Sequence, residues 1–144
     1  KIDLLIDKTG GIHSHFEITS FFNIVQVWNS GVTFGIFRNL IYGKIILSIA
    51  TFSIMIGVCY LLWKAKTKYH AVCFSLIIAG ALGNLIDRIR FGAVADFLDF
   101  HLFGYHWPAF NVADSLVCIA VFLIIIEDFI FKKNKEKEKN NISV

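Results

Sequence analysis

Two stretches without any Asp, Glu, Lys or Arg constrain the fold of this chain more than any other feature: residues 45–63 and residues 69–86, which are 19 and 18 residues long. A helix needs about 17–25 mostly apolar residues to cross the hydrocarbon of a bilayer. Composition agrees, because 56% of the 144 residues are hydrophobic and only 17% are charged, against about 25% charged in soluble domains. The sequence therefore predicts a membrane protein, mainly α-helical, with a single domain over residues 1–144.

A third apolar stretch is less clean, because residues 115–126 are too short to cross a bilayer alone. A span of sufficient length covers residues 111–131, which places Asp114 at one end and Glu127 and Asp128 at the other. Residues 132–144, rich in Lys and Asn, are expected to form a disordered basic tail. We expect a small bundle of transmembrane helices at residues 45–63, 69–88 and 111–131.

The lysines orient these spans. The loop between the first two spans holds three lysines and no acid, and the tail holds five lysines against Glu136 and Glu138. Such loops stay on the cytoplasmic side, so we expect the loop and the tail inside, and residues 1–44 and 87–114 outside. This topology has an odd number of spans and an outside N-terminus, and residues 1–10 lack the features of a signal peptide. We therefore expect that the chain lacks a first span.

The segment before the first span has a different texture. Residues 18–37, "ITSFFNIVQVWNSGVTFGIF", are rich in β-branched and aromatic residues, and Asn29-Ser30-Gly31 is a turn signal. Residues 1–44 are therefore expected to form a small β-structured platform on the outer side. The alternative is an irregular loop that lies on the bilayer, with Phe and Trp as interfacial anchors.

Polar residues gather where the second span ends. Asn84, Asp87 and Arg88 share one helical face, and Gly80 and Gly83 are small enough to let another backbone approach. Ionisable groups at membrane depth are expensive and are kept mostly where they face a wet cavity or each other. For Asp87, an ion pair with Arg88 at the helix end is an alternative to a role in catalysis.

Two further acids lie on the same expected side of the membrane. Asp96 is flanked by apolar residues in "AVADFLDF", and Asp114 opens an apolar helix in "WPAFNVADS". Taken singly, Asp114 suits a helix N-cap and Asp96 suits a side chain facing water. Together they suit a carboxylate pair that shares one proton, with one acid activating water and the other donating a proton.

Other chemistries find less support. The sequence has no H-E-x-x-H and no G-x-S-x-G motif, and we expect no metal, no cofactor and no nucleic-acid partner. Cys59, Cys73 and Cys118 fall in the expected spans and are interpreted as buried small hydrophobes. A non-enzymatic ion-transport or membrane-assembly subunit stays open as an alternative, although ion transport favours acids near mid-span rather than at span ends.

Three motifs, "WNSGVTFG", "GALGNLIDRIRFGAVADFLDF" and "WPAFNVADS", in this order and with these gaps, closely resemble the lipoprotein signal peptidases, also called signal peptidase II. The resemblance covers roughly residues 18–131. It implies a monomeric aspartyl endopeptidase of the bacterial inner membrane, usually built on four transmembrane helices, with its active site at the outer, periplasmic face. Such enzymes cut prolipoproteins just before a diacylglyceryl-modified Cys.

The same resemblance assigns roles to individual residues. The catalytic pair falls on Asp96 and Asp114. Contacts to the substrate are expected from Arg88, Asn111 and Asn29. Asn84 and Asp87 are expected to support Arg88 and the short segment that carries Asp96.

Overall fold

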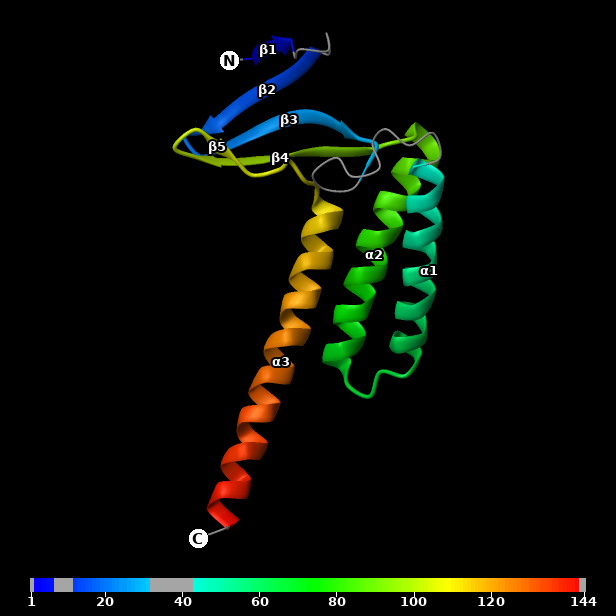
Figure 1. Cartoon of the computed structure of the whole chain (residues 1–144), viewed down its shortest axis with the longest axis vertical. Coiled ribbons are helices and arrows are strands. Elements are labelled where there is room, and N and C mark those ends of the chain that lie inside the picture. The colour runs from blue at the N-terminus through cyan, green and yellow to red at the C-terminus, as the bar shows by residue number, and fades with distance from the viewer. Residues whose placement is uncertain (1, 7–11, 32–42, 143–144) are drawn as a thin grey trace.

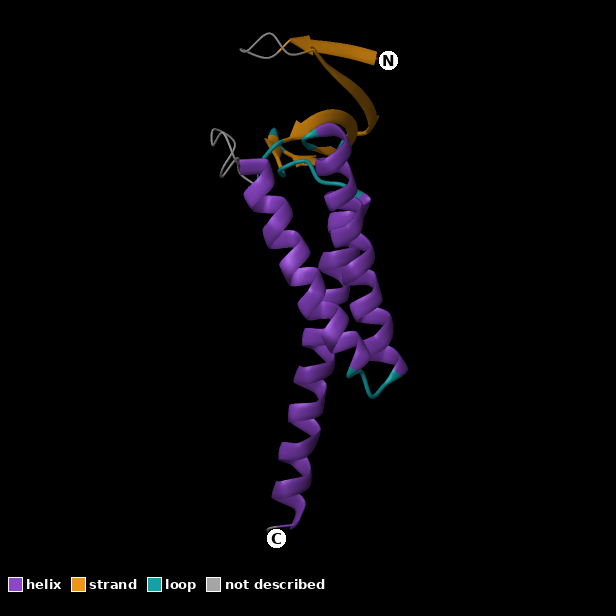
Figure 2. Ribbon diagram, turned by 90° about the vertical axis from the view of Figure 1, so that its right-hand side faces the viewer, coloured by secondary structure: helices purple, strands orange, loops and turns teal. Residues whose placement is uncertain are grey.

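The computed structural model describes residues 2–6, 12–31 and 43–142, which form three helices and a five-stranded sheet. The strands are β1 (Ile2–Ile6), β2 (Ile12–Thr19), β3 (Phe22–Asn29), β4 (Val94–Leu102) and β5 (Tyr105–His106). The helices are α1 (Gly43–Trp63), α2 (Lys68–Phe91) and α3 (Val112–Ile142). The sheet lies at one end of the helices, and the α1–α2 loop and the C-terminus lie at the other (Figures 1 and 2).

Helices α1 and α2 are long and apolar enough to cross a membrane, with a mean hydropathy of 2.4 over Ile45–Trp63 and 1.7 over α2. None of Ile45–Trp63 is buried by protein, as suits a surface that faces lipid. Thr67 caps the start of α2 by accepting a hydrogen bond from the backbone N–H of His70 (3.1 Å), and Gly92 ends the helix at φ 75°. The spans expected at residues 45–63 and 69–88 therefore lie within α1 and α2.

Helix α3 differs from the expectation at its C-terminal end. Residues 132–144 were expected to be disordered, yet α3 continues to Ile142. The stretch after Phe131 is mostly Lys and Glu, which are good helix formers, and it contains no Gly or Pro to stop the helix. Among the described helices, α3 is not counted as a membrane span by length and composition. Three acidic residues, Asp114, Glu127 and Asp128, fall within the stretch expected to cross.

The core lies between α2 and α3, where Cys73, Leu85 and Ala120 are buried. Gly80 makes this packing possible, because a Cβ there would collide with the carbonyl oxygen of Ala113 and approach the side chain of Val117 to 2.7 Å. The close backbone approach expected at Gly80 is thus confirmed. The interpretation of all three cysteines as buried is wrong for two of them. Cys73 is buried, whereas Cys59 and Cys118 are exposed on the outer faces of their helices.

The sheet has the order β1-β2-β3-β4-β5, and every neighbouring pair is antiparallel. A register shift between Ile24 and Val27 inserts one extra residue into β3 opposite β4, which bends this pair of strands. The β-structured platform expected within residues 1–44 is confirmed for β1, β2 and β3. Residues 7–11 and 32–42 of that expectation lie outside the described residues.

Candidate active site

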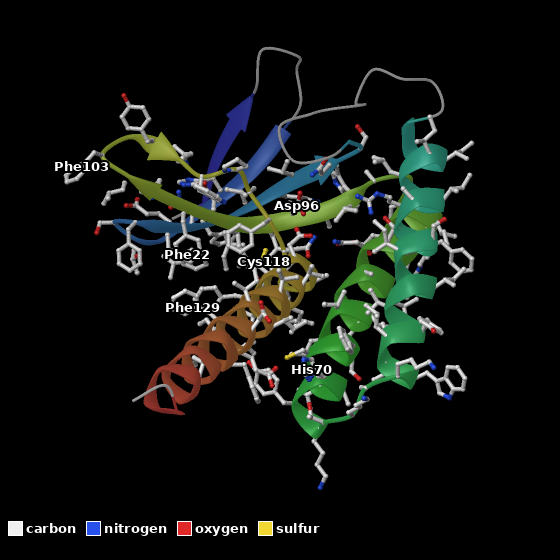
Figure 3. All side chains as sticks on the ribbon, turned by 60° about the horizontal axis from the view of Figure 1, so that its bottom comes forward. Phe22, His70, Asp96, Phe103, Cys118 and Phe129 are labelled. Carbon is white, nitrogen blue, oxygen red and sulfur yellow. The ribbon has the colours of Figure 1, made fainter. Side chains whose placement is uncertain are left out.

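Four segments converge where the sheet meets the helices, and each brings polar side chains. Strand β4 carries Asp96, which Figure 3 labels on the sheet close to the ends of the helices. The end of β3 brings Asn29, the last turns of α2 bring Asn84, Asp87 and Arg88, and the start of α3 brings Asn111 and Asp114. All seven residues singled out from the sequence therefore lie on the elements that meet at this junction.

Asp96 is a buried carboxylate, only 3% exposed. Asn29 donates from Nδ2 to Asp96 Oδ2 (3.0 Å), and Asn111 donates from Nδ2 to Asp96 Oδ1 (2.8 Å). Both carboxylate oxygens thus have an amide donor, one from the sheet and one from α3. The side chain is held in a fixed orientation from two directions.

Asp114 is held by the start of its own helix and by α2. Asn84 donates from Nδ2 to Asp114 Oδ1 (2.7 Å), and the backbone N–H of Asn111 donates to Asp114 Oδ2 (3.3 Å). In return, the backbone N–H of Asp114 donates to Asn111 Oδ1 (3.0 Å). This reciprocal pair is a capping box. The alternative that Asp114 is the N-cap is therefore wrong: Asn111 is the N-cap, and Asp114 sits in the first turn.

Asn111 connects the two acids. Its Nδ2 donates to Asp96 and also to Asn84 Oδ1 (3.1 Å), while Asn84 in turn donates to Asp114. A primary amide has only two N–H donors, and both donors of Asn111 are used here. The two carboxylates thus belong to one hydrogen-bonded chain that runs through two amides.

The electrostatics of Asp96 follow from its burial. Loss of hydration raises the pKa of the Asp96 carboxyl above its ordinary value, because burial disfavours the charged form. The hydrogen bonds from Asn29 and Asn111 and the charge of Arg88 lower this pKa, and the negative field of Asp114 raises it further. The net direction is upward, so Asp96 holds a proton more readily than an exposed aspartate.

Arg88 has at least one N–H donor that no described residue uses. Its Nη1 lies 3.5 Å from the backbone oxygen of Asn84, and its Nε is buried without a hydrogen-bond partner among the described residues. Arg88 also lines a cavity of about 500 Å³ together with Ile45, Ser48 and Ile49 of α1. A half-buried guanidinium beside a cavity is suited to bind carbonyl oxygens of a ligand.

Asp87 supports the strand that carries Asp96. Its Oδ2 accepts a hydrogen bond from the backbone N–H of Ala95 (3.3 Å), next to Asp96 in β4. Gly92 allows the sharp change of direction between α2 and β4, and its backbone N–H bonds to the carbonyl of Arg88 (3.0 Å). The structure thus shows Asp87 bound to the backbone of β4, an arrangement different from the ion pair with Arg88 that the sequence left open.

The sequence reasoning missed a second buried carboxylate on β4. Asp99 is 6% exposed; it accepts from Asn23 Nδ2 (2.9 Å), and its Oδ2 lies 2.9 Å from His106 Nδ1. Side chains alternate along a strand, so Asp96 and Asp99 point to opposite faces. The alternation would have revealed this, but residues 94–102 were not recognised as a strand. In the described part of the chain, no three His, Cys, Asp or Glu side chains gather as metal ligands would.

Comparison with known proteins identifies the family. The family model described as signal peptidase (SPase) II matches residues 3–130. The chain belongs to the signal peptidase II family. It is 38% identical over 122 residues to the lipoprotein signal peptidase of Anaplasma phagocytophilum, covering 85% of this chain and 78% of that protein. It is 40% identical over 126 residues to the lipoprotein signal peptidase of Pelagibacter ubique, covering 85% and 74%.

Two solved structures, both described as bacterial membrane enzymes studied by the in meso method, share this fold. One superposes with a TM-score of 0.76 at 39% identity, covering 89% of this chain and 78% of the other. The second gives a TM-score of 0.69 at 41% identity, covering 78% and 73%. The expected fold, a mainly helical membrane enzyme with a small β platform, is confirmed, and the signal peptidase II family places it among aspartic peptidases.

Proposed function

We propose that this chain cleaves signal peptides from prolipoproteins by hydrolysis, with Asp96 and Asp114 as its catalytic pair. The observation that carries the proposal is the hydrogen-bonded chain that joins the two carboxylates through Asn111 and Asn84, where the sheet meets the helices. Both acids lie close to the end of the helices that meets the sheet. Asp96 is on strand β4, and Asp114 is in the first turn of α3. This placement favours a peptidase over the ion-transport alternative, which would use acids near mid-span.

The proposed reaction uses one water and one shared proton. The ionised carboxylate takes a proton from the water while the water oxygen attacks the scissile carbonyl carbon, and the protonated carboxyl donates its proton to the carbonyl oxygen. Collapse of the tetrahedral intermediate breaks the C–N bond, and the leaving amine receives a proton from the pair. The raised pKa of Asp96 favours Asp96 as the acid that starts protonated and Asp114 as the base.

The geometry separates residues that bind substrate from those that orient the acids. Arg88 keeps unused donors beside a cavity and is proposed to hold the substrate backbone. Both amide donors of Asn111 are engaged, and Asn29 donates to Asp96 while accepting from Gly31 N–H (3.0 Å). We therefore expect Asn29 and Asn111 to contribute to substrate binding mainly through the position of Asp96. One chain supplies both acids, so the proposed enzyme acts as a monomer.

The orientation in the membrane is proposed from the lysines. The α1–α2 loop, which contains Lys64 and Lys66, and the C-terminal end of α3 lie opposite the sheet (Figure 1), and loops rich in lysine stay cytoplasmic. The sheet and both acids then lie at the outer face. Single cysteines at Lys66 and His106, in a chain without its natural cysteines, test this in spheroplasts. An impermeant thiol reagent should label only the His106 variant, and the reverse pattern would invert the orientation.

The proposed substrate carries a diacylglyceryl group on the Cys that follows the cleaved bond. Its acyl chains can lie against exposed apolar faces such as those of Ile49 and Ile54 on α1. Burial of such chains contributes about 0.8 kcal/mol per CH₂, which a bare peptide lacks. We therefore expect the lipid to supply much of the binding.

The decisive experiment incubates the purified protein in detergent with a diacylglyceryl-modified prolipoprotein and with the same prolipoprotein lacking the lipid. The modified substrate should be shortened by loss of its signal peptide, and the unmodified one should persist. The matched control is the Asp114→Asn protein at the same concentration. Equal cleavage of both substrates would refute the lipid requirement, and equal cleavage by the control would point to a contaminating protease.

A further inference from the structure

The β4–β5 hairpin is unusually apolar for a surface turn. Residues 100–110, "FHLFGYHWPAF", contain no Asp, Glu, Lys or Arg. Phe103 is 92% exposed, the highest value among the large apolar residues described, and Tyr105 and Trp107 are 85% and 67% exposed. Scattered exposed apolar residues are ordinary, but a contiguous aromatic group indicates an interaction surface.

The turn of this hairpin contains a residue type that such turns disfavour. Leu102 pairs with Tyr105, so Phe103 and Gly104 form a two-residue hairpin loop. Both have positive φ, 50° for Phe103 and 82° for Gly104. Such loops favour Asn, Asp or Gly at the first position, and a bulky side chain there is strained. Phe103 thus combines a strained backbone with an exposed ring, and contact of the ring with an apolar partner would offset its exposure to water.

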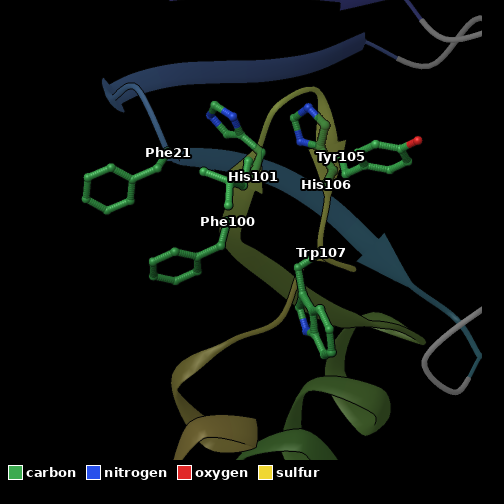
Figure 4. Close-up of a pocket in the computed structure, with 7 residues that line it drawn as sticks. Phe21, Phe100, His101, Tyr105, His106 and Trp107 are labelled. Atoms are coloured by element: carbon green, nitrogen blue, oxygen red, sulfur yellow. The ribbon is translucent and has the colours of Figure 1, made fainter.

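The hairpin has two different faces. One face carries polar contacts, because His106 binds the buried carboxylate of Asp99 and stacks on His101 with ring centroids 4.9 Å apart. On the other face Phe100 packs against Phe22 and Phe110, with centroids 4.8 and 5.9 Å apart. In Figure 4, the two histidine rings point away from the helices while Trp107 points toward them. The aromatic face is thus the one turned toward the membrane-spanning part of the molecule.

The same region is hollowed and leads into the start of α3. A cavity of about 470 Å³ is lined by Phe21, Phe100 and Trp107 among others, and its walls are almost entirely apolar. Strand β4 follows directly after α2, and the hairpin leads through Pro108 into α3. The sheet extends sideways from one end of the helices (Figure 1), so the hairpin lies at about the level of the helix ends that meet the sheet.

We propose that the β4–β5 hairpin is a membrane anchor whose tip and aromatic face lie in the headgroup region of the bilayer, on the side where the sheet lies. An aromatic ring with a polar edge, such as the indole of Trp107, favours this depth. Phe103 lies at the tip, where its ring reaches lipid. Because Asp96 is on the same strand, the anchor fixes the height of the catalytic strand above the hydrocarbon.

The test uses the full chain in liposomes with Trp107 as its single tryptophan, made by Trp28→Phe and Trp63→Phe. Brominated phosphatidylcholines, with bromine near the headgroup or deep in the acyl chains, quench tryptophan by contact. The control carries a single tryptophan at Phe16→Trp on β2, which rises away from the helices (Figure 1). Shallow bromine should quench Trp107 about twofold or more beyond both deep bromine and the control, as for an interfacial aromatic.

A second variant isolates the tip. Phe103→Asn suits a positive φ, so the hairpin should still form, but quenching of Trp107 should fall toward that of the control. Equal quenching of Trp107 and the Phe16→Trp control would show that the hairpin faces water and would overturn the proposal. So would blue-shifted but unquenched emission, which would mean that protein, such as a second copy, covers it. Unchanged quenching in Phe103→Asn would exclude Phe103 as the anchor. None of these readings depends on peptidase activity.

Discussion

Asp96 and Asp99 lie three residues apart on one strand, both buried, yet their surroundings differ. Asp96 faces the helices, where its amide partners lead on to a second carboxylate, Asp114. Asp99 faces the opposite side, where it binds Asn23 and the histidine His106. Burial alone therefore does not decide which of these two acids we propose as catalytic. What distinguishes Asp96 is a second acid within reach of the same hydrogen-bonded chain.

The largest expected effect is a difference in cleavage activity between variants of Asp96 and variants of Asp99. Asp96→Asn and Asp114→Asn should each lower the rate of prolipoprotein cleavage by about 10³-fold or more, because Asn can neither accept a proton from water nor hold one for the carbonyl oxygen. Asp99→Asn should keep most of the activity per folded molecule. Initial rates in detergent measure this, after gel filtration shows that each variant is folded. A loss confined to Asp99→Asn would reverse the comparison.

A smaller effect is expected from the amide that joins the acids. Asn111→Ser keeps an N-cap oxygen for α3 but removes the donors to Asp96 and Asn84, so activity should fall about 10- to 100-fold while the contribution of the helix cap to stability is kept. Asn111→Ala is the matched control, because it removes the cap as well and should cost about 1 kcal/mol of folding free energy more. Full activity in Asn111→Ser would show that the acids do not need this bridge.

Replacing Asp99 should affect the stability of the protein more than its activity. Asp99→Ala leaves the amide of Asn23 and the ring of His106 without their partner, which should destabilise the protein by about 1–3 kcal/mol. Cleavage by the molecules that remain folded should change far less. Thermal unfolding in detergent, compared with the specific rate below the transition, measures both quantities. A catalytic loss without destabilisation would assign Asp99 to the active site.

The smallest expected effect is on the pH dependence of the folding stability. Burial raises the pKa of Asp96 in the folded protein, so the folded state binds that proton more tightly than the unfolded chain. The stability contributed by this group is therefore present at low pH and falls as pH rises from the ordinary Asp pKa of about 3.9 through the raised value. Asp96→Asn should remove this dependence and gain stability relative to the wild type as pH rises above the ordinary Asp pKa. A constant difference in Tm would argue against the raised pKa.

The sequence predicted the parts of the molecule that depend on local composition. Uncharged runs located α1 and α2, and the turn at Asn29 to Gly31 indicated a β platform, because each signal is contained in one segment. The end of α3 was missed, since a lysine-rich stretch is compatible with either disorder or helix. Strands β4 and β5 were also missed, because Asp99 and the histidines hide the alternation, and because β4 pairs with β3, which lies far away in the sequence.

For the candidate site too, local features were open to prediction from the sequence and long-range contacts were not. The resemblance to a family named the residues, but their connections depend on the tertiary fold. The N-x-x-D pattern from Asn111 to Asp114 is a local capping signal that was open to recognition from the sequence. The bond from Asn29 to Asp96 spans 67 residues, and the pair of Asn23 with Asp99 spans 76. Such contacts follow from sheet register, which one sequence does not determine.

The most direct test of the central claim is a double-variant cycle on the cleavage rate. If Asp96 and Asp114 act as one unit, the double variant Asp96→Asn/Asp114→Asn should be within about threefold of either single variant, since each loss already removes the whole mechanism. Combining Asp99→Asn with Asp114→Asn should instead multiply their separate, independent effects. Rates that multiply for Asp96 and Asp114, as for two unrelated sites, would contradict the account of a shared catalytic pair.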